Sequence, residues 1–166
     1  IREQALPHAL LFVGGRGVGK RLTARALAMA LNCQSDPETG KAPAEGCGVC
    51  RACRKIETDQ HPDVIWVSAA GASIRIEQIR DLCRTLALKP FEAATRVVVI
   101  PDAQAMTASA ANALLKVLEE PPAQTLLILT AIQTAALLPT IVSRCQLLRF
   151  SPIDRESLTR YLVARH

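Results

Sequence analysis

Aromatic side chains are scarce in this sequence and make up 3% of its 166 residues. The five rings are spread along the chain: Phe12, Trp66, Phe91, Phe150 and Tyr161. Proteins that bind single-stranded nucleic acid commonly stack successive bases on aromatic side chains. Five scattered rings cannot form such a surface, so the composition excludes a base-stacking binder.

The sequence also lacks a convincing membrane span and a visible secretory signal. Residues 121–143 carry no charge, yet they include two glutamines, four threonines and Pro139, which a membrane span rarely contains. The chain opens Ile-Arg-Glu-Gln and soon reaches a loop-and-helix pattern, unlike a signal peptide. We therefore expect a soluble, cytoplasmic protein without membrane contact. The absence of Met at position 1 leads us to expect a piece trimmed from a longer chain.

Apolar residues are abundant, and the positive charge is unevenly distributed. Of all residues, 49% are hydrophobic and 21% are charged, which suits about one domain with a buried core. The net charge is +5, and residues 1–32 alone hold five Lys/Arg against one Glu, a net charge of +4. This local excess favours an anionic partner near the start of the chain.

Short apolar runs alternate with helical patterns along the chain. Some runs are continuous rather than alternating, as in strands buried on both faces of a parallel sheet. Strands are expected over residues 9–13, 64–67, 97–100, 126–130 and 147–150, and helices over 20–32, 76–86, 108–119 and 137–143. The sequence therefore predicts an α/β core over residues 1–150 with a five-stranded, mostly parallel sheet. Residues 33–61 interrupt it as a cysteine-rich module, and residues 151–166 are expected to begin a further helical domain.

A glycine-rich loop follows the first expected strand and opens the first expected helix. It matches the G-x-x-x-x-G-K pattern of a P-loop, in which backbone N–H groups surround phosphates and the lysine reaches the β- and γ-phosphates. The candidate nucleotide-binding residues are Gly14, Gly15, Arg16, Gly17, Val18, Gly19, Lys20 and Arg21. The alternative is a glycine-rich turn that only packs a helix on a sheet.

Two positions argue against metal-assisted hydrolysis at this loop. A working P-loop has Ser or Thr after the lysine, whose hydroxyl holds Mg²⁺, whereas this chain has Arg21. Thr23 lies about 200° further around the helix and cannot replace that hydroxyl. The strand expected over 97–100 is followed by Pro101 and Asp102, so a proline stands where a metal-binding Asp is expected. We therefore expect at most weak binding of ATP or ADP and a lost Mg²⁺ site.

Four cysteines predict a metal site. They have the spacing C-x13-C-x2-C-x2-C: Cys33, Cys47, Cys50 and Cys53. Four thiolates form a closed and therefore structural zinc site. An iron–sulfur cluster and free or redox-active thiols are the alternatives, and His61 is a candidate to replace one ligand. Residues 33–61 hold five acidic and four basic side chains, a net charge of −1, which favours a structural or protein-contact role over DNA binding.

Four short phrases accompany the P-loop and the cysteine spacing. They are HALLF at 8–12, LNC at 31–33, NALLKVLEEPP at 112–122 and SRC at 143–145. In combination they resemble the bacterial clamp-loader subunits of DNA polymerase III, in the AAA+ superfamily, over residues 7–150. This family contains motor subunits and the delta-prime subunit, whose ATP site is usually degraded. The departures at Arg21 and at Pro101-Asp102 make the chain resemble delta-prime.

The resemblance implies a AAA+ P-loop NTPase core with helices on both faces of the sheet, a structural zinc ion, and residues 151–166 as the start of a helical lid. It implies a non-motor subunit of a hetero-pentamer that loads the sliding clamp on primed DNA. The partners would be the motor subunits and the delta subunit, with the clamp contacted indirectly and contact with primed DNA left open.

The resemblance also assigns a role to Arg144 of the SRC phrase. It would act in trans as an arginine finger on ATP bound to the neighbouring motor subunit, stabilising charge on the transferred phosphoryl group. Little or no ATPase activity is then expected of the chain itself. The alternatives are an active ATPase motor subunit and a zinc-dependent nucleic-acid binder outside replication.

Overall fold

The computed structural model describes residues 6–34 and 46–152, together with the single positions 154, 156, 159, 160 and 163. Its centre is a five-stranded sheet of order β2-β3-β4-β1-β5, in which neighbouring strands all pair in parallel. The strands are β1 (Ala9–Val13), β2 (Val64–Trp66), β3 (Arg96–Ile100), β4 (Thr125–Ala131) and β5 (Gln146–Arg149). The five predicted strands are confirmed, each end to within one residue.

The inner strands are continuous apolar runs because both faces of the sheet are covered. Every residue of β1, β3 and β4 is buried, whereas the edge strand β5 is largely exposed. Strand β1 lies between β4 and β5, so the glycine-rich loop that follows it emerges at the carboxyl edge of the sheet. Ligand sites of open α/β sheets form at this edge.

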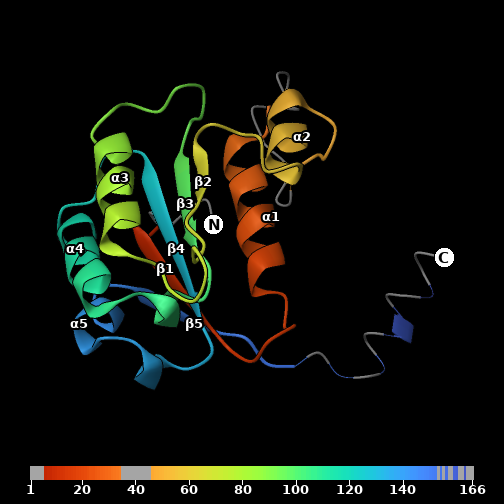
Figure 1. Cartoon of the computed structure of the whole chain (residues 1–166). Coiled ribbons are helices and arrows are strands. Elements are labelled where there is room, and N and C mark those ends of the chain that lie inside the picture. Colours follow the sequence, from red (N-terminus) through yellow and green to blue (C-terminus); the bar gives the residue numbers. More distant parts are fainter. Residues whose placement is uncertain are drawn as a thin grey trace.

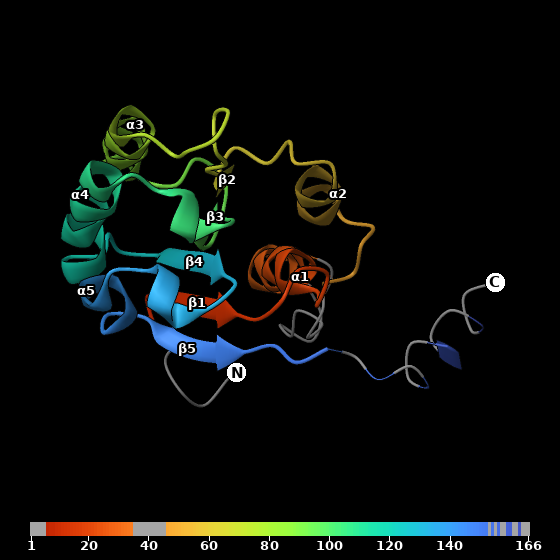
Figure 2. The same cartoon turned by 60° about the horizontal axis from the view of Figure 1, so that its bottom comes forward.

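Helices lie on both faces of the sheet, as expected (Figures 1 and 2). One face carries α3 (Ile76–Leu86), α4 (Ala108–Glu119) and α5 (Pro139–Val142). The other face carries α1 (Lys20–Asn32), and α2 (Arg51–Glu57) packs against α1. Each face has its own buried cluster. On the α1 side, the small residues Ala24 and Ala28 belong to one cluster with Phe12 and Ile128, which lets the helix lie close to the sheet.

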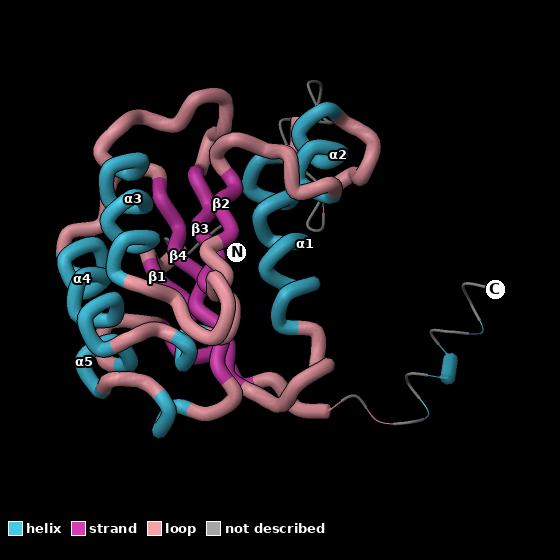
Figure 3. Tube along the Cα trace, viewed as in Figure 1, coloured by secondary structure: helices cyan, strands magenta, loops and turns pink. Residues whose placement is uncertain are grey.

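Other segments differ from the prediction or lie outside what the structure describes. Helix α2 was not predicted; it begins where the Cys50 side chain accepts a hydrogen bond from the backbone N–H of Cys53. Two 3₁₀ turns, η1 (Ala103–Ala105) and η2 (Thr134–Ala136), were also not predicted (Figure 3). The helix expected over 151–166 lies mostly outside the described residues. Within the described part, no helix is long and apolar enough to cross a membrane.

Candidate functional site

The glycine-rich loop is tied to two neighbouring strands at the carboxyl edge of the sheet. The backbone N–H of Gly14 donates to Ala131 O at 3.2 Å, and that of Phe150 donates to Val13 O at 2.7 Å. A Cβ on Gly14 would lie 2.3 Å from the carbonyl oxygen of Phe150, so only glycine fits there. Gly19 has φ +92°, a left-handed conformation that favours glycine, and it caps α1 with its backbone alone. These contacts place the loop directly at the start of α1.

Lys20 lies folded against this loop. Its side-chain Nζ donates to Gly14 O and Gly15 O, each at 2.6 Å, and the residue is 8% exposed. The first turn of α1 contains no acidic residue, so the partial positive charge of the helix N-terminus is not offset within that turn. An ammonium, a glycine loop and a helix N-terminus thus meet at one point, which is the arrangement that binds phosphate groups.

Arg21, at the Mg²⁺-coordinating position of a working P-loop, points toward the end of β2. Its guanidinium carbon lies 5.5 Å from the centroid of the Trp66 ring, within cation–π range. The guanidinium of Arg25, one turn further along α1, is also 5.5 Å from that centroid and pairs with Asp59 at 2.7 Å. Sequence reasoning found Arg21 but missed Trp66 as its partner, because nothing in the sequence places β2 beside α1.

Asp102, the one carboxylate expected after β3, is exposed and held by neighbours. Its backbone adopts φ +52°, and its N–H donates to Thr130 Oγ1 at 3.1 Å. The side-chain amide of Gln104 donates to Asp102 Oδ1 at 3.1 Å. Pro101 is buried at the end of β3. The strand end therefore offers a single carboxylate that already accepts a hydrogen bond.

The four predicted metal ligands come together. The sulfur atoms of Cys33, Cys47, Cys50 and Cys53 all lie within 4.8 Å of one another. Backbone N–H groups point at them: that of Cys47 donates to Cys33 Sγ at 3.4 Å and that of Cys50 to Cys47 Sγ at 3.2 Å. Burial raises the pKa of the Cys53 thiol to about 12. Four convergent sulfurs fit a tetrahedral zinc ion, which would hold these groups as thiolates, the buried Cys53 included.

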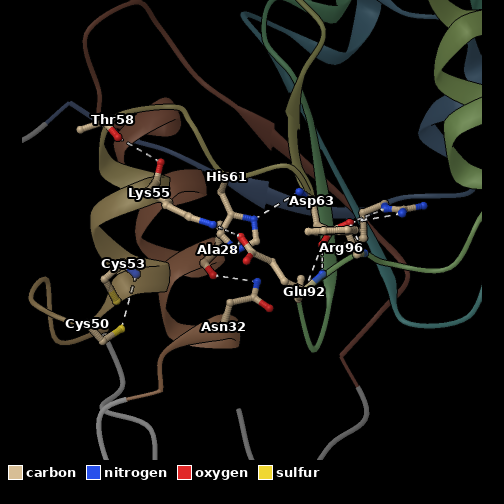
Figure 4. A network of polar contacts seen from close by, with 12 residues as sticks. Ala28, Asn32, Cys50, Cys53, Lys55, Thr58, His61, Asp63, Glu92 and Arg96 are labelled. Atoms are coloured by element: carbon tan, nitrogen blue, oxygen red, sulfur yellow. Dashed lines mark hydrogen bonds and ion pairs between the residues drawn. The ribbon is translucent and has the colours of Figure 1, made fainter.

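His61 does not join this cluster, so its suggested role as a replacement ligand is wrong for the described arrangement (Figure 4). The ring is buried, and its Nδ1 accepts a hydrogen bond from the backbone N–H of Asp63 at 3.2 Å. Its Nε2 lies 3.7 Å from Glu92 Oε1, which also pairs with Lys55 at 2.5 Å. Burial lowers the pKa of His61, despite the opposing charge of Glu92. The Lys55–Glu92 pair therefore links the cysteine module to the segment before β3, and the buried His61 ring lies beside that pair.

A buried ion pair next to His61 went unpredicted. Asp63 accepts hydrogen bonds from the backbone N–H groups of residues 91, 92 and 93 and pairs with Arg96 at 3.2 Å. Arg96 in turn donates to the carbonyl groups of residues 85, 88 and 89. Asn32, at the end of α1, exchanges two hydrogen bonds with the backbone of Thr95. Together they fix the segment between α3 and β3, which is a structural role.

Arg144 lies just beyond α5, away from the glycine loop of its own chain. Its Nη2 lies 2.8 Å from Glu119 Oε1, and its Nη1 donates to Thr140 O at 3.0 Å. The side chain remains 35% exposed. The structure thus separates the predicted site residues into three places: the P-loop, the cysteine cluster and the α4–α5 corner.

Comparison with known proteins identifies the family. A family model described as "DNA polymerase III, delta subunit" matches residues 1–154. The delta-prime subunit of Bacillus subtilis is 39% identical over 98% of this chain and 48% of its own length. The delta-prime subunit of Pseudomonas aeruginosa is 42% identical over 83% of this chain and 41% of its own length. The tau subunit of Escherichia coli is 39% identical over 93% of this chain and 23% of its own length. The chain thus spans half or less of these curated relatives.

Solved structures agree on the fold. A DNA polymerase III gamma subunit-related protein of Thermotoga maritima has a TM-score of 0.64 and 25% identity, over 98% of this chain and 46% of that one. The Thermotoga maritima RuvB Holliday junction branch migration motor shares the fold alone. Its TM-score is 0.58 and its identity 14%, over 96% of this chain and 42% of that one. The fold is the expected AAA+ core. The motifs, the fold and the family match agree, and the chain belongs to the DNA polymerase III family that contains the delta-prime subunits.

Proposed function

We propose that this chain is the core of a non-motor clamp-loader subunit, which helps a hetero-pentamer load the sliding clamp on primed DNA. The match to delta-prime subunits over 83–98% of the chain supports this role. Because the chain spans about half of those relatives, the role of the whole protein and its partners, the motor subunits and the delta subunit, are part of the proposal. The cysteine cluster would hold a structural zinc ion.

The P-loop of this chain is proposed to bind nucleotide phosphates without a metal ion. The observation that carries this is the contrast between adjacent residues: Lys20 lies against the glycine loop, while Arg21 replaces the Mg²⁺-binding hydroxyl and lies over Trp66. A Mg²⁺ ion held by a hydroxyl at this position would otherwise supply positive charge that stabilises phosphoryl transfer. With a guanidinium at this position and one carboxylate after β3, phosphate binding is retained and hydrolysis is lost.

Nucleotide binding to the full-length protein, measured with Mg²⁺ and with EDTA, tests this site. We expect the Kd for ADP to differ by less than about twofold between the two conditions, because no metal ion takes part in binding. A twofold change corresponds to about 0.4 kcal/mol of binding free energy. Lys20→Ala should abolish binding, whereas Lys116→Ala, on the opposite face of the sheet, should not. Binding that requires Mg²⁺ would contradict the proposal.

A motor subunit is the second candidate, because the Escherichia coli tau subunit is as similar to the chain as the Bacillus subtilis delta-prime subunit, each at 39% identity. The two functions differ in one measurement. ATP hydrolysis by the isolated full-length subunit, lost in Lys20→Ala, would establish the motor function. A Lys20→Ala subunit that leaves the ATPase of the reconstituted complex unchanged supports the non-motor function.

Arg144 is proposed to act on ATP bound to a neighbouring motor subunit. Its partial exposure at the α4–α5 corner supports a contact outside its own chain. Arginine fingers in other systems accelerate phosphoryl transfer by about 10³–10⁵ at the site they serve. Arg144→Ala should leave the subunit folded and lower the ATPase of the reconstituted complex. An unchanged ATPase of the complex would rule out this role.

A further inference from the structure

Arg144 has a carboxylate partner that the sequence analysis did not assign. Helix α4 ends at Glu119, and the Pro121-Pro122 pair that follows cannot continue the helix. This ending places the Glu119 carboxylate beside α5, where Oε1 lies 2.8 Å from Arg144 Nη2. The carbonyl oxygen of Thr140 accepts from Nη1 at 3.0 Å. Groups from two helices therefore contact the two terminal nitrogens of one guanidinium.

This arrangement fixes part of the guanidinium and leaves the rest for another anion. A guanidinium carries five N–H groups in a planar fork. Within the described part of the chain, its contacts are one ion pair and one hydrogen bond, both at the terminal nitrogens. The side chain is 35% exposed, so part of it remains open to a phosphate from outside. A preset orientation reduces the side-chain entropy lost when that phosphate binds.

We propose that Glu119 is a positioning residue for Arg144: its carboxylate holds the guanidinium in the orientation that meets the neighbouring subunit's nucleotide. The inference rests on the proposed role of Arg144 and deepens it. The partners are 35% and 49% exposed, and ion pairs at that exposure contribute little to folding. The effect of Glu119 should therefore fall on the rate of ATP hydrolysis and not on stability or on the affinity of the motor subunit for ATP.

The adjacent glutamate provides a matched control. Glu120 caps the end of α4, is exposed, and has no ion pair among the described residues. A substitution there removes the same charge from the same end of the helix without touching Arg144. Any difference between the two positions then comes from the contact with Arg144 and not from the change in net charge.

The test uses the full-length protein in the reconstituted clamp-loader complex, with kcat and KM for ATP measured for Glu119→Ala, Glu119→Gln, Glu120→Ala, Arg144→Ala and the double variant of residues 119 and 144. We expect Glu119→Ala to lower the Arg144-dependent part of kcat about two- to fivefold, as the strength of an exposed ion pair allows, with KM unchanged. Glu119→Gln should lose less, because its amide oxygen still accepts a hydrogen bond. Glu120→Ala should match the wild type, and the double variant should match Arg144→Ala.

Two results separate the inference from the function on which it rests. If Arg144→Ala lowers kcat while Glu119→Ala does not, or if Glu119→Ala lowers kcat further in the Arg144→Ala background, the positioning role is overturned and the arginine finger stands. If Arg144→Ala leaves the ATPase unchanged, the finger itself fails and the role of Glu119 falls with it. Melting temperatures of all variants confirm that each is folded.

Discussion

Arg96 and Arg144 each face a carboxylate of the same chain, but in opposite surroundings. The Arg96–Asp63 pair is separated by 3.2 Å, and its side chains are 4% and 2% exposed. The Arg144–Glu119 pair is shorter, at 2.8 Å, yet its side chains are 35% and 49% exposed. The shorter contact is not the stronger one, because water screens the exposed pair while the buried pair is enclosed by further hydrogen-bond donors and acceptors. Burial of the two side chains, and not the distance between their charged atoms, decides whether an ion pair serves the fold alone or leaves its arginine able to bind a second partner.

The buried pair shapes a surface segment. The Asp63 carboxylate accepts hydrogen bonds from the backbone N–H groups of residues 91–93. The Arg96 guanidinium donates to the carbonyl groups of residues 85, 88 and 89. The chain between α3 and β3 is thus held from inside, while Phe91 on that segment is 83% exposed. Arg144 has no such enclosure, which leaves it able to take a second partner.

The largest expected effect comes from breaking the buried pair. Asp63→Ala leaves the Arg96 guanidinium buried without its carboxylate, so we expect the free energy of unfolding to fall by about 3–5 kcal/mol. Urea unfolding measures this, and Asp63→Asn, which keeps acceptor capacity, should lose less. The control is Asp81→Ala, which removes the exposed Arg84–Asp81 pair and should cost under about 0.5 kcal/mol. Equal losses at positions 63 and 81 would contradict the comparison.

The same pair should also respond to acid. Burial by itself raises the pKa of the Asp63 carboxyl, but the N–H groups of Glu92, Phe91 and Ala93 and the Arg96 side chain outweigh it and hold the pKa below its usual value. The unfolded pKa is about 3.9, so this contribution to stability is complete above that value and is lost as the pH falls through the folded pKa.

We therefore expect the difference in unfolding free energy between wild type and Asp63→Ala to be constant from about pH 5 to 7 and to shrink below about pH 4. Urea titrations at a series of pH values check this window. A difference that grew on acidification would mean that the folded pKa lies above the unfolded one.

The smallest effect belongs to the exposed pair. Glu119→Ala and Arg144→Ala should each change the unfolding free energy by under about 1 kcal/mol, and the coupling between them should weaken as salt rises from about 0.05 to 0.5 M. A double-mutant cycle at both salt concentrations measures the coupling. A coupling free energy above about 2 kcal/mol that does not change with salt would show that this pair stabilises the fold as a buried ion pair does.

Much of the fold could be predicted because its signals are local. The apolar runs that became β1, β3 and β4 are continuous, and a continuous run reports burial on both faces without any knowledge of neighbours. Helix α2 was missed because its seven residues are too short for an amphipathic pattern and its start depends on the sulfur of Cys50. The metal site could be predicted from the spacing of the cysteines, because four ligands of one type within a short stretch fit few kinds of site other than structural zinc.

The missed site residues depend on contacts between distant segments. Asp63 and Arg96 are 33 positions apart and meet because β2 pairs with β3. Trp66 meets Arg21 across the α1 face, and Glu119 meets Arg144 because α4 and α5 end at the same corner. Residue type alone does not tell the environment of Asp63 from that of Glu119. Only the packing of elements distinguishes the buried carboxylate from the exposed one.

Trp66 gives the protein an intrinsic optical reporter. It is the one tryptophan of the sequence, and the guanidiniums of Arg21 and Arg25 both lie 5.5 Å from the centroid of its ring. Indole emission responds to charges close to the ring, so any movement of Arg21 toward a bound phosphate would change the fluorescence of Trp66. The first turns of the helix after the glycine loop can therefore be followed without an added label, through the one tryptophan among these 166 residues.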